Sequence, residues 1–143
     1  TMTGLPVEEV RAQIRAGGRS GAIRRYRAVV DWDAVDDDPT RETVTAFIDV
    51  SITPARGVGF DDVAGRIARF DEVRSVYLVS GSQDLRCTVT APTIRAVSDF
   101  VSQKLSTIDR VRSTATHFVL KTYKRDGDAF QTPEPDHRLP VTP

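Results

Sequence analysis

The chain has 143 residues, which is enough for one core domain with appended segments. Its 20 basic and 20 acidic residues balance, so no overall charge favours nucleic acid or a membrane surface as a partner. The lone cysteine, Cys87, excludes a disulfide framework, and no apolar run is long enough to span a bilayer. Since no signal peptide is visible, we expect a cytoplasmic protein.

The first part of the chain divides by charge into a basic head and an acidic linker. Residues 1–30 carry six Arg and two Glu, for a net charge of +4, whereas residues 31–42 carry six acids and one Arg, for a net charge of −5. Composition shifts again at the end, where four of the last eleven residues are Pro. We therefore expect a boundary at residues 31–42 and an extended tail after the core.

The basic head has the pattern of a helix followed by a strand. Pro6 suits the first helical position, and Gly17 and Gly18 are expected to end the helix. The segment at residues 23–31 then has the composition of a basic strand. The apolar stripe of the helix consists of Val7, Val10 and Ile14.

An internal repeat organises the core. The segment "FDEVRSVYLVSG" begins at Phe70, and the similar segment "IDRVRSTATHFV" begins 38 residues later, at Ile108. Each segment follows an apolar stripe with helical spacing, and each stripe follows a strand-like alternation. The stripes consist of Phe60, Val63, Ile67 and Phe70, and of Ile94, Val97, Val101, Leu105 and Ile108. The alternating positions are Val44, Ala46, Ile48, Val50 and Ile52, then Leu85, Cys87 and Val89.

The order of strand, helix, strand, strand, helix, strand predicts an α+β fold. In this ferredoxin-like βαββαβ arrangement, both helices cover one face of a four-stranded antiparallel sheet. On the first two strands, Phe47 and Tyr77 lie opposite to the main apolar rows, and the last strand is apolar at Phe118, Val119 and Leu120. An open face with such residues favours self-association, although scattered apolar residues are also ordinary on sheets.

Three parts of the sequence have patterns that occur together in one family: "GAIRRYRAVVD", "VSGSQD", and the spaced positions Ser113, Thr116, Val119 and Leu120. With them the chain resembles the Lrp/AsnC family, the leucine-responsive and asparagine regulators of bacterial and archaeal transcription. "GAIRRYRAVVD" at residues 21–31 is similar to the segment that follows the recognition helix of the family. "VSGSQD" at residues 79–84 resembles the V-x-G-x-x-D pattern at the end of the second strand of its ligand-binding domain, called RAM. The pattern of the last RAM strand is matched at Ser113, Thr116, Val119 and Leu120. The RAM domain of the family has the ferredoxin-like order.

The resemblance implies a division of the chain into four parts. Residues 1–30 would be a remnant of a DNA-binding domain, with a recognition-like helix and a linker strand. An acidic linker at residues 31–42 would follow, then a RAM effector-binding and oligomerisation domain at residues 43–125, and an extended tail at residues 126–143. Only five residues precede Pro6, so the first two helices of the family's DNA-binding domain are not in this sequence. Two explanations stay open: the sequence is a piece of a longer regulator, or it is a variant that never had that unit.

The resemblance also implies the partners. Family members form homodimers that assemble into tetramers or octamers, and the strand at residues 23–31 could pair with its counterpart across a dimer. Small effectors, usually amino acids, bind near the loop between dimers. Duplex DNA is expected as a partner only when the two absent helices are supplied.

The polar stretch "SGSQD" between two strands has two interpretations. Gly81 and Asp84 suit a tight hairpin turn, which alone would explain the composition. Alternatively, backbone N–H groups and the Ser80 and Ser82 hydroxyls would bind the carboxylate of an amino acid, and the Asp84 carboxylate its ammonium group. Gln83 stands where many family members have an aromatic residue. The candidate effector residues are Ser80, Gly81, Ser82, Gln83, Asp84, Thr114 and Thr116.

Two further readings concern DNA and catalysis. The candidate DNA contacts are Arg11, Gln13, Arg15, Arg19 and Arg24, although a solvated basic helix that binds duplex DNA weakly and without sequence preference explains them as well. No His, Cys or Asp cluster has catalytic or metal-ligand spacing, so no catalytic residue, cofactor or metal is predicted. His117 would be the residue to suspect in a small dimeric α-β barrel enzyme. A stand-alone assembly or sensor domain without DNA binding is another alternative.

Overall fold

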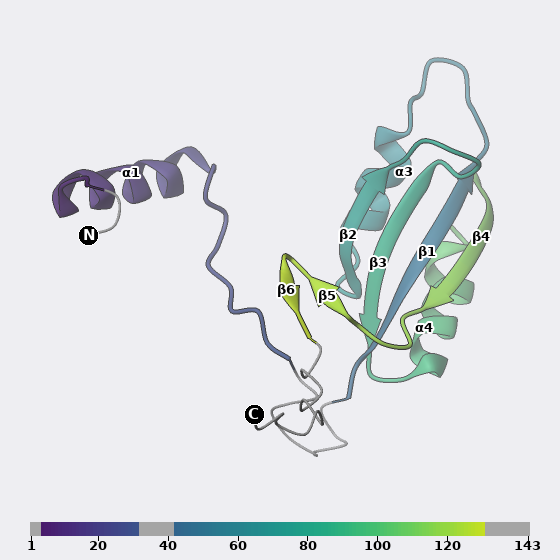
Figure 1. The fold of residues 1–143 in the computed structure, drawn as a ribbon. Helices are drawn as coiled ribbons and strands as arrows, with labels where there is room; N and C mark the ends of the chain where they lie inside the picture. Colours follow the sequence, from purple (N-terminus) through teal and green to yellow (C-terminus); the bar gives the residue numbers. More distant parts are fainter. Residues whose placement is uncertain (1–3, 32–41, 131–143) are drawn as a thin grey trace, which may run out of the picture.

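A computed structural model describes residues 4–31 and 42–130 of the chain (Figure 1). Most of the acidic linker, at residues 32–41, and the tail at residues 131–143 lie outside the described residues. The described part begins with helix α1 (Val7–Ser20), which stands apart from a sheet that is covered by helices on one side (Figure 1).

The sheet confirms the predicted ferredoxin-like fold. Its strands are β1 (Val44–Ile52), β2 (Val73–Leu78), β3 (Leu85–Ala91) and β4 (Val111–Phe118), and their spatial order is β2-β3-β1-β4 with every neighbouring pair antiparallel. Helices α3 (Asp61–Ala68) and α4 (Ile94–Phe100) lie behind the sheet in Figure 1, so its other face is turned to the viewer.

The core lies between the two inner strands and the helices. Ile48, Val50, Leu85, Cys87 and Val89 are fully or almost fully buried at the predicted alternating positions. The helices add Val63, Ile67, Val97, Phe100 and Leu105. Each of these large apolar side chains contributes about 1.5–3 kcal/mol when it is removed from water, so the alternation on β1 and β3 decides which face of the sheet the helices cover.

The second core helix does not keep one straight stripe. A π-helical turn, η2 (Val101–Leu105), continues α4, and Ser106 N–H donates to Val101 O at 2.8 Å. Phe100 and Leu105 are buried, whereas Ile94, predicted to face the core, is 58% exposed. The expected stripe was wrong at Ile94, which is the first residue of α4, whereas Val97 and Leu105 are buried as predicted.

Helix α1 ends later than predicted. It passes through Gly17 and Gly18 and ends where Gly21 adopts a left-handed conformation with φ of 78°. Pro6 lies just before the first helical residue. A β-carbon at Gly17 would lie only 2.7 Å from the side chain of Ile23, whose N–H donates to Gly17 O at 2.9 Å. Gly17 therefore permits a close chain approach and does not end the helix.

Two other predicted segments also differ. Residues 23–31 pair with no strand among the described residues; their backbone is instead held at single points, as where Val30 O accepts a hydrogen bond from Arg125 Nη2 at 2.9 Å. The predicted tail at residues 126–143 begins inside a short hairpin of β5 (Lys124–Arg125) and β6 (Asp128–Ala129), which Phe130 N–H closes by donating to Tyr123 O at 2.9 Å. Leu120, predicted on the last strand, lies beyond β4 and is 95% exposed.

Candidate functional site

The loop between β2 and β3, residues 79–84, is attached to the end of β1. Val79 N–H donates to Asp84 O at 3.0 Å, and Asp84 N–H donates to Val50 O at 3.1 Å. The Asp84 carboxylate accepts the Ile52 N–H through Oδ2 at 2.8 Å. Gly81 has a φ of 119°, which a residue with a β-carbon rarely adopts. The loop is therefore a fixed turn that Gly81 makes possible and Asp84 anchors.

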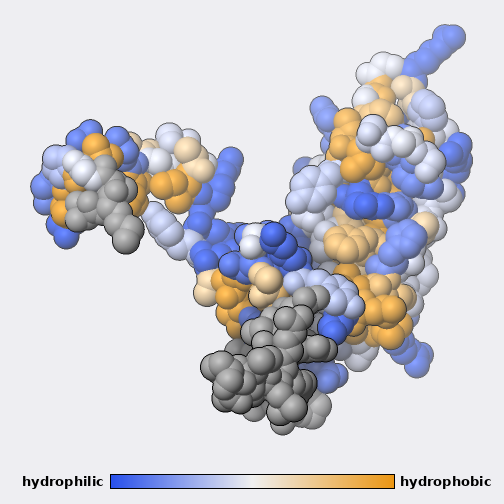
Figure 2. Space-filling view, viewed as in Figure 1, coloured by the Kyte–Doolittle hydropathy of each residue, from blue (hydrophilic) through white to orange (hydrophobic). Residues whose placement is uncertain are grey.

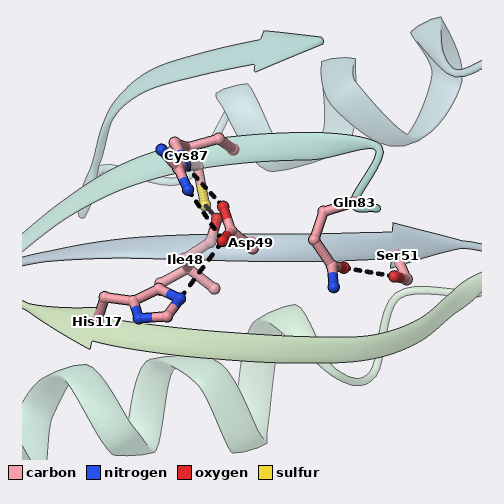
Figure 3. A network of polar contacts seen from close by, with 7 residues as sticks. Ile48, Asp49, Ser51, Gln83, Cys87 and His117 are labelled. Atoms are coloured by element: carbon pink, nitrogen blue, oxygen red, sulfur yellow. Dashed lines mark hydrogen bonds and ion pairs between the residues drawn. The ribbon is translucent and has the colours of Figure 1, made fainter. Parts of the chain in front are cut away.

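Gln83 extends this attachment onto the open face of the sheet. Its Oε1 accepts a hydrogen bond from the hydroxyl of Ser51 on β1, and the two side chains point toward each other in Figure 3. Ser51 is almost completely buried although it lies on the face without helices. Gln83 covers it, so the departure from the aromatic family pattern at this position has a structural role in this chain.

Several polar groups of the loop are not used by the fold. Within the described part of the chain, the N–H groups of Gly81, Ser82 and Gln83 donate no hydrogen bond, and the Ser80 and Ser82 side chains are exposed. Successive backbone N–H groups in a turn form a concave site that attracts anions. The Oδ1 atom of Asp84 also accepts no hydrogen bond from a described residue. A carboxylate acceptor and several donors thus lie on one short loop.

A charged cluster lies on the open face next to Ser51. Arg86 on β3 donates to Asp49 on β1 from Nε to Oδ1 at 2.7 Å, and His117 Nε2 on β4 lies 3.4 Å from Asp49 Oδ2 (Figure 3). The Asp49 side chain is only 11% exposed. Hydrogen bonding to Arg86 lowers the pKa of Asp49 below 3.8, against the opposing effect of burial. One buried carboxylate therefore joins three neighbouring strands.

The strand register divides the predicted effector residues between the two faces. Thr114 lies opposite Val50 and Thr116 opposite Ile48, and directly opposed residues share a face of the sheet. Both threonines are thus on the side that the helices cover, whereas Gln83 reaches Ser51 on the open side. The predicted effector residues that lie together in one loop are Ser80, Gly81, Ser82, Gln83 and Asp84. The two threonines lie on the other face of the sheet from Gln83. Their effector role stays a prediction.

The predicted DNA contacts lie on and just after α1. Helical spacing of about 3.6 residues per turn puts Arg11, Arg15 and Arg19 on one side and Gln13 on another. Arg11 Nη1 lies 3.4 Å from Glu8 Oε1, and Arg24 follows the end of the helix. No residue of α1 is buried. Its arginines are therefore accessible, and their role on DNA stays a prediction.

Comparison with known proteins decides the family. Residues 45–129 match the family described as the Lrp/AsnC ligand binding domain. The chain belongs to the Lrp/AsnC family. Over 142 residues it is 51% identical to the uncharacterized HTH-type transcriptional regulator YugG of Bacillus subtilis, covering 99% of this chain and 84% of that protein. Over 126 residues it is 30% identical to the HTH-type transcriptional regulator LrpA of Mycobacterium tuberculosis, covering 88% and 78%. It is thus an Lrp/AsnC-type transcriptional regulator with an effector-binding domain.

Solved Lrp/AsnC structures agree with this assignment. A feast or famine regulatory protein of M. tuberculosis complexed with L-methionine has a TM-score of 0.66 and 26% identity, covering 90% of this chain and 81% of that chain. A regulator of Neisseria meningitidis in complex with L-methionine has a TM-score of 0.63 and 26% identity, covering 90% and 77%. In the present chain, no helix of the described residues is both long and apolar enough to cross a membrane.

Sequence reasoning missed the central residues of the Lrp/AsnC open face in this chain. Asp49 and Ser51 alternate with the core positions of β1, and Arg86 alternates with the core positions of β3. A buried carboxylate needs a partner, so a polar pair in a central strand was an available signal. The strand register places Arg86 opposite Asp49 and His117 opposite Phe47. The spacing of apolar residues does not reveal this register.

Proposed function

We propose that this Lrp/AsnC regulator senses a free amino acid with the loop at residues 79–84. The supporting observation is that the loop has three successive N–H groups without hydrogen-bond partners among the described residues and a carboxylate oxygen beside them. The N–H groups suit the carboxylate of an amino acid, and Asp84 Oδ1 suits its ammonium group. The two relatives solved with L-methionine support this class of effector.

Asp84 has two tasks in this proposal, which a suitable variant can separate. Oδ2 holds the loop to Ile52, so replacement by alanine would release the loop and would not test ammonium binding alone. Asparagine has the same shape, and its amide oxygen can still accept the Ile52 N–H while the negative charge is lost. Asp84→Asn is therefore the informative change.

The effector experiment uses thermal unfolding and calorimetry with a panel of free amino acids. We expect at least one to raise the unfolding midpoint of the wild-type protein, because a ligand of the folded state stabilises it. Asp84→Asn should weaken binding about tenfold or more, since a hydrogen-bonded charge pair is worth about 1.5–3 kcal/mol. Asp99→Asn is the matched control at an exposed carboxylate on α4. Unchanged binding by Asp84→Asn, or no binding by any amino acid, contradicts the proposal.

Assembly through the open face is the second part of the proposal. Phe47 and Tyr77 are 41% and 58% exposed there, next to the Asp49 cluster, and Figure 2 shows apolar and hydrophilic side chains mixed over this face. We infer a homodimer that pairs into a tetramer or octamer, with the effector loop near a contact between dimers. Light scattering tests this: a strict monomer at micromolar concentration contradicts it.

DNA binding is proposed only together with further helices of the family's DNA-binding unit. The apolar residues Val7 and Ile14 of α1 are 53% and 44% exposed, so this helix has no core of its own. We expect the 143-residue chain to bind duplex DNA weakly and without sequence preference. A salt titration that showed tight, sequence-selective binding would overturn this. No catalytic role is proposed for His117, which contacts Asp49.

A further inference from the structure

Arg110 has an unusual backbone conformation at the start of β4. Its φ is 76°, and within the described residues Asp126 is the other non-glycine residue with a positive φ. An L-residue with a β-carbon is disfavoured in this region, so its surroundings must hold it there. Arg110 N–H donates to the neighbouring Asp109 Oδ1 at 3.1 Å, and Thr53 N–H donates to Arg110 O at 2.8 Å.

The guanidinium group of Arg110 holds the loop between β1 and α3, residues 53–59. Nε donates to Thr53 O at 3.2 Å, Nη1 to Gly59 O at 3.2 Å and Nη2 to Val58 O at 3.4 Å. Both ends of the loop are therefore bound to one planar group. A bridge between Ala55 and Val58 closes the loop between these ends.

Two adjacent peptide groups at the end of β1 connect this loop to the effector loop. Ile52 N–H donates to the Asp84 carboxylate, and the next N–H, of Thr53, donates to Arg110 O. Peptide groups are planar, so only the two backbone dihedral angles of Ile52 separate these contacts. A displacement of residues 79–84 that acts on Ile52 should therefore reach Thr53 and, through Arg110, residues 55–59.

We propose that Arg110 is a positioning residue that couples the effector loop at residues 79–84 to the loop at residues 53–59. Its left-handed backbone directs the carbonyl to Thr53 N–H while the side chain spans both ends of the second loop. Effector occupancy is then transmitted to residues 53–59. The ligand-dependent part rests on the proposed function, whereas the mechanical coupling can be tested without a ligand.

The test is a double-mutant cycle read by hydrogen exchange at the Val58 amide, which donates to Ala55 O at 3.3 Å inside the loop that Arg110 holds. Arg110→Gly removes the guanidinium group and tolerates the positive φ, so we expect little loss of global stability but at least tenfold faster exchange there. Asp84→Ala, which removes the acceptor of the Ile52 N–H, should also accelerate exchange at the Val58 amide in the wild-type background and have no further effect in Arg110→Gly. Arg110→Lys should restore only part of the protection, because one ammonium group cannot span three carbonyls. Additive effects of the two changes would overturn the coupling.

The control and the ligand measurement separate the two proposals. Asp126→Gly relieves the other positive φ in the β5–β6 hairpin and should leave exchange at the Val58 amide unchanged. An amino acid that binds should protect residues 80–84 and also the Val58 amide, the latter only while Arg110 is present. Protection of residues 80–84 alone overturns the coupling and leaves the proposed function standing. If no amino acid binds, the proposed function fails, and the ligand-free cycle still decides the coupling.

Discussion

Arg86 binds Asp49 at two points across the β1–β3 pair, with Nε 2.7 Å from Oδ1 and Nη2 3.0 Å from Oδ2. This two-point contact keeps the carboxylate charged although its side chain is only 11% exposed, whereas the Arg86 side chain is 50% exposed. His117 approaches the same carboxylate from β4. The cluster fixes the relative register of three strands, and it makes the stability of the sheet sensitive to acid.

The first prediction is that Asp49→Asn destabilises the protein and flattens its acid dependence. The folded-state pKa of Asp49 lies below the ordinary 3.8, so its contribution is present above pH 3.8 and is lost as the pH falls through the lower folded value. We expect a loss of about 1–2 kcal/mol at neutral pH from the weakened hydrogen bonds. Urea unfolding between neutral and acidic pH measures both effects.

Asp62→Asn is the control for this prediction. Its carboxylate lies 3.9 Å from Arg66 Nε, but both side chains are 52% exposed. An exposed pair of this kind contributes about 0–1 kcal/mol, so the change should have little effect. Equal pH profiles for Asp49→Asn and the wild-type protein would show that the Asp49 cluster does not contribute.

The second prediction contrasts two exposed glycines. Gly81 has a φ of 119°, so Gly81→Ala should destabilise the protein by about 1–2 kcal/mol through backbone strain, although its β-carbon would meet open space. Gly65 lies inside α3 and also faces open space, so Gly65→Ala should stabilise by up to about 1 kcal/mol. Thermal unfolding of both variants compares the signs, and a stabilising Gly81→Ala would refute the strained-turn assignment.

The third prediction concerns the reactivity of Cys87. Burial is the largest cause that raises the pKa of this thiol to about 11, and its side chain is fully buried. At pH 8 only about one thiol in a thousand is then ionised, and the thiolate is the reactive form. A thiol reagent should therefore label the native protein very slowly and the urea-unfolded protein at once. Because Cys87 is the single cysteine of the chain, rapid native labelling would directly show that the core opens.

The fourth prediction tests the start of α4. The Thr93 hydroxyl accepts the N–H of Ala96 at 3.0 Å, as expected for a helix cap. Thr93→Ala should cost about 1 kcal/mol, whereas Thr93→Ser keeps the hydroxyl and should cost less. Chemical denaturation distinguishes the two variants. Equal losses would indicate that the methyl group of Thr93, and not its hydroxyl, stabilises this end.

Much of the fold was predictable because the core follows local periodicity. The alternation on β1 and β3 identified the buried face, and the 38-residue repeat identified equivalent strands, since β2 begins at Val73 and β4 at Val111. Asp61 and Asp62 lie in the first turn of α3, where negative charge suits the helix dipole. These features depend on residues that are close in sequence, so spacing alone reveals them.

The candidate site was less predictable because it depends on register between distant strands. Thr114 and Thr116 have hydroxyl groups that could bind an effector. However, Thr114 pairs with Val50 and Thr116 with Ile48, which puts both threonines on the face that the helices cover. The hydrogen bond from the Ile52 N–H to the Asp84 carboxylate likewise depends on where the loop meets β1. Neither relationship is encoded in the spacing of apolar residues along one strand.

The π turn in η2 has a consequence for insertions and deletions in the second core helix. Phe100 and Leu105 are five residues apart, and both are buried. In a regular α-helix, five residues rotate a side chain to about 140° from its starting direction, so the two could not share a core face. The wider turn accommodates one residue more than an α-helical turn would need. Shortening residues 101–104 by one should therefore convert this turn to α-helix while both anchors still reach the core, so we expect the helix to tolerate a one-residue deletion best at this point.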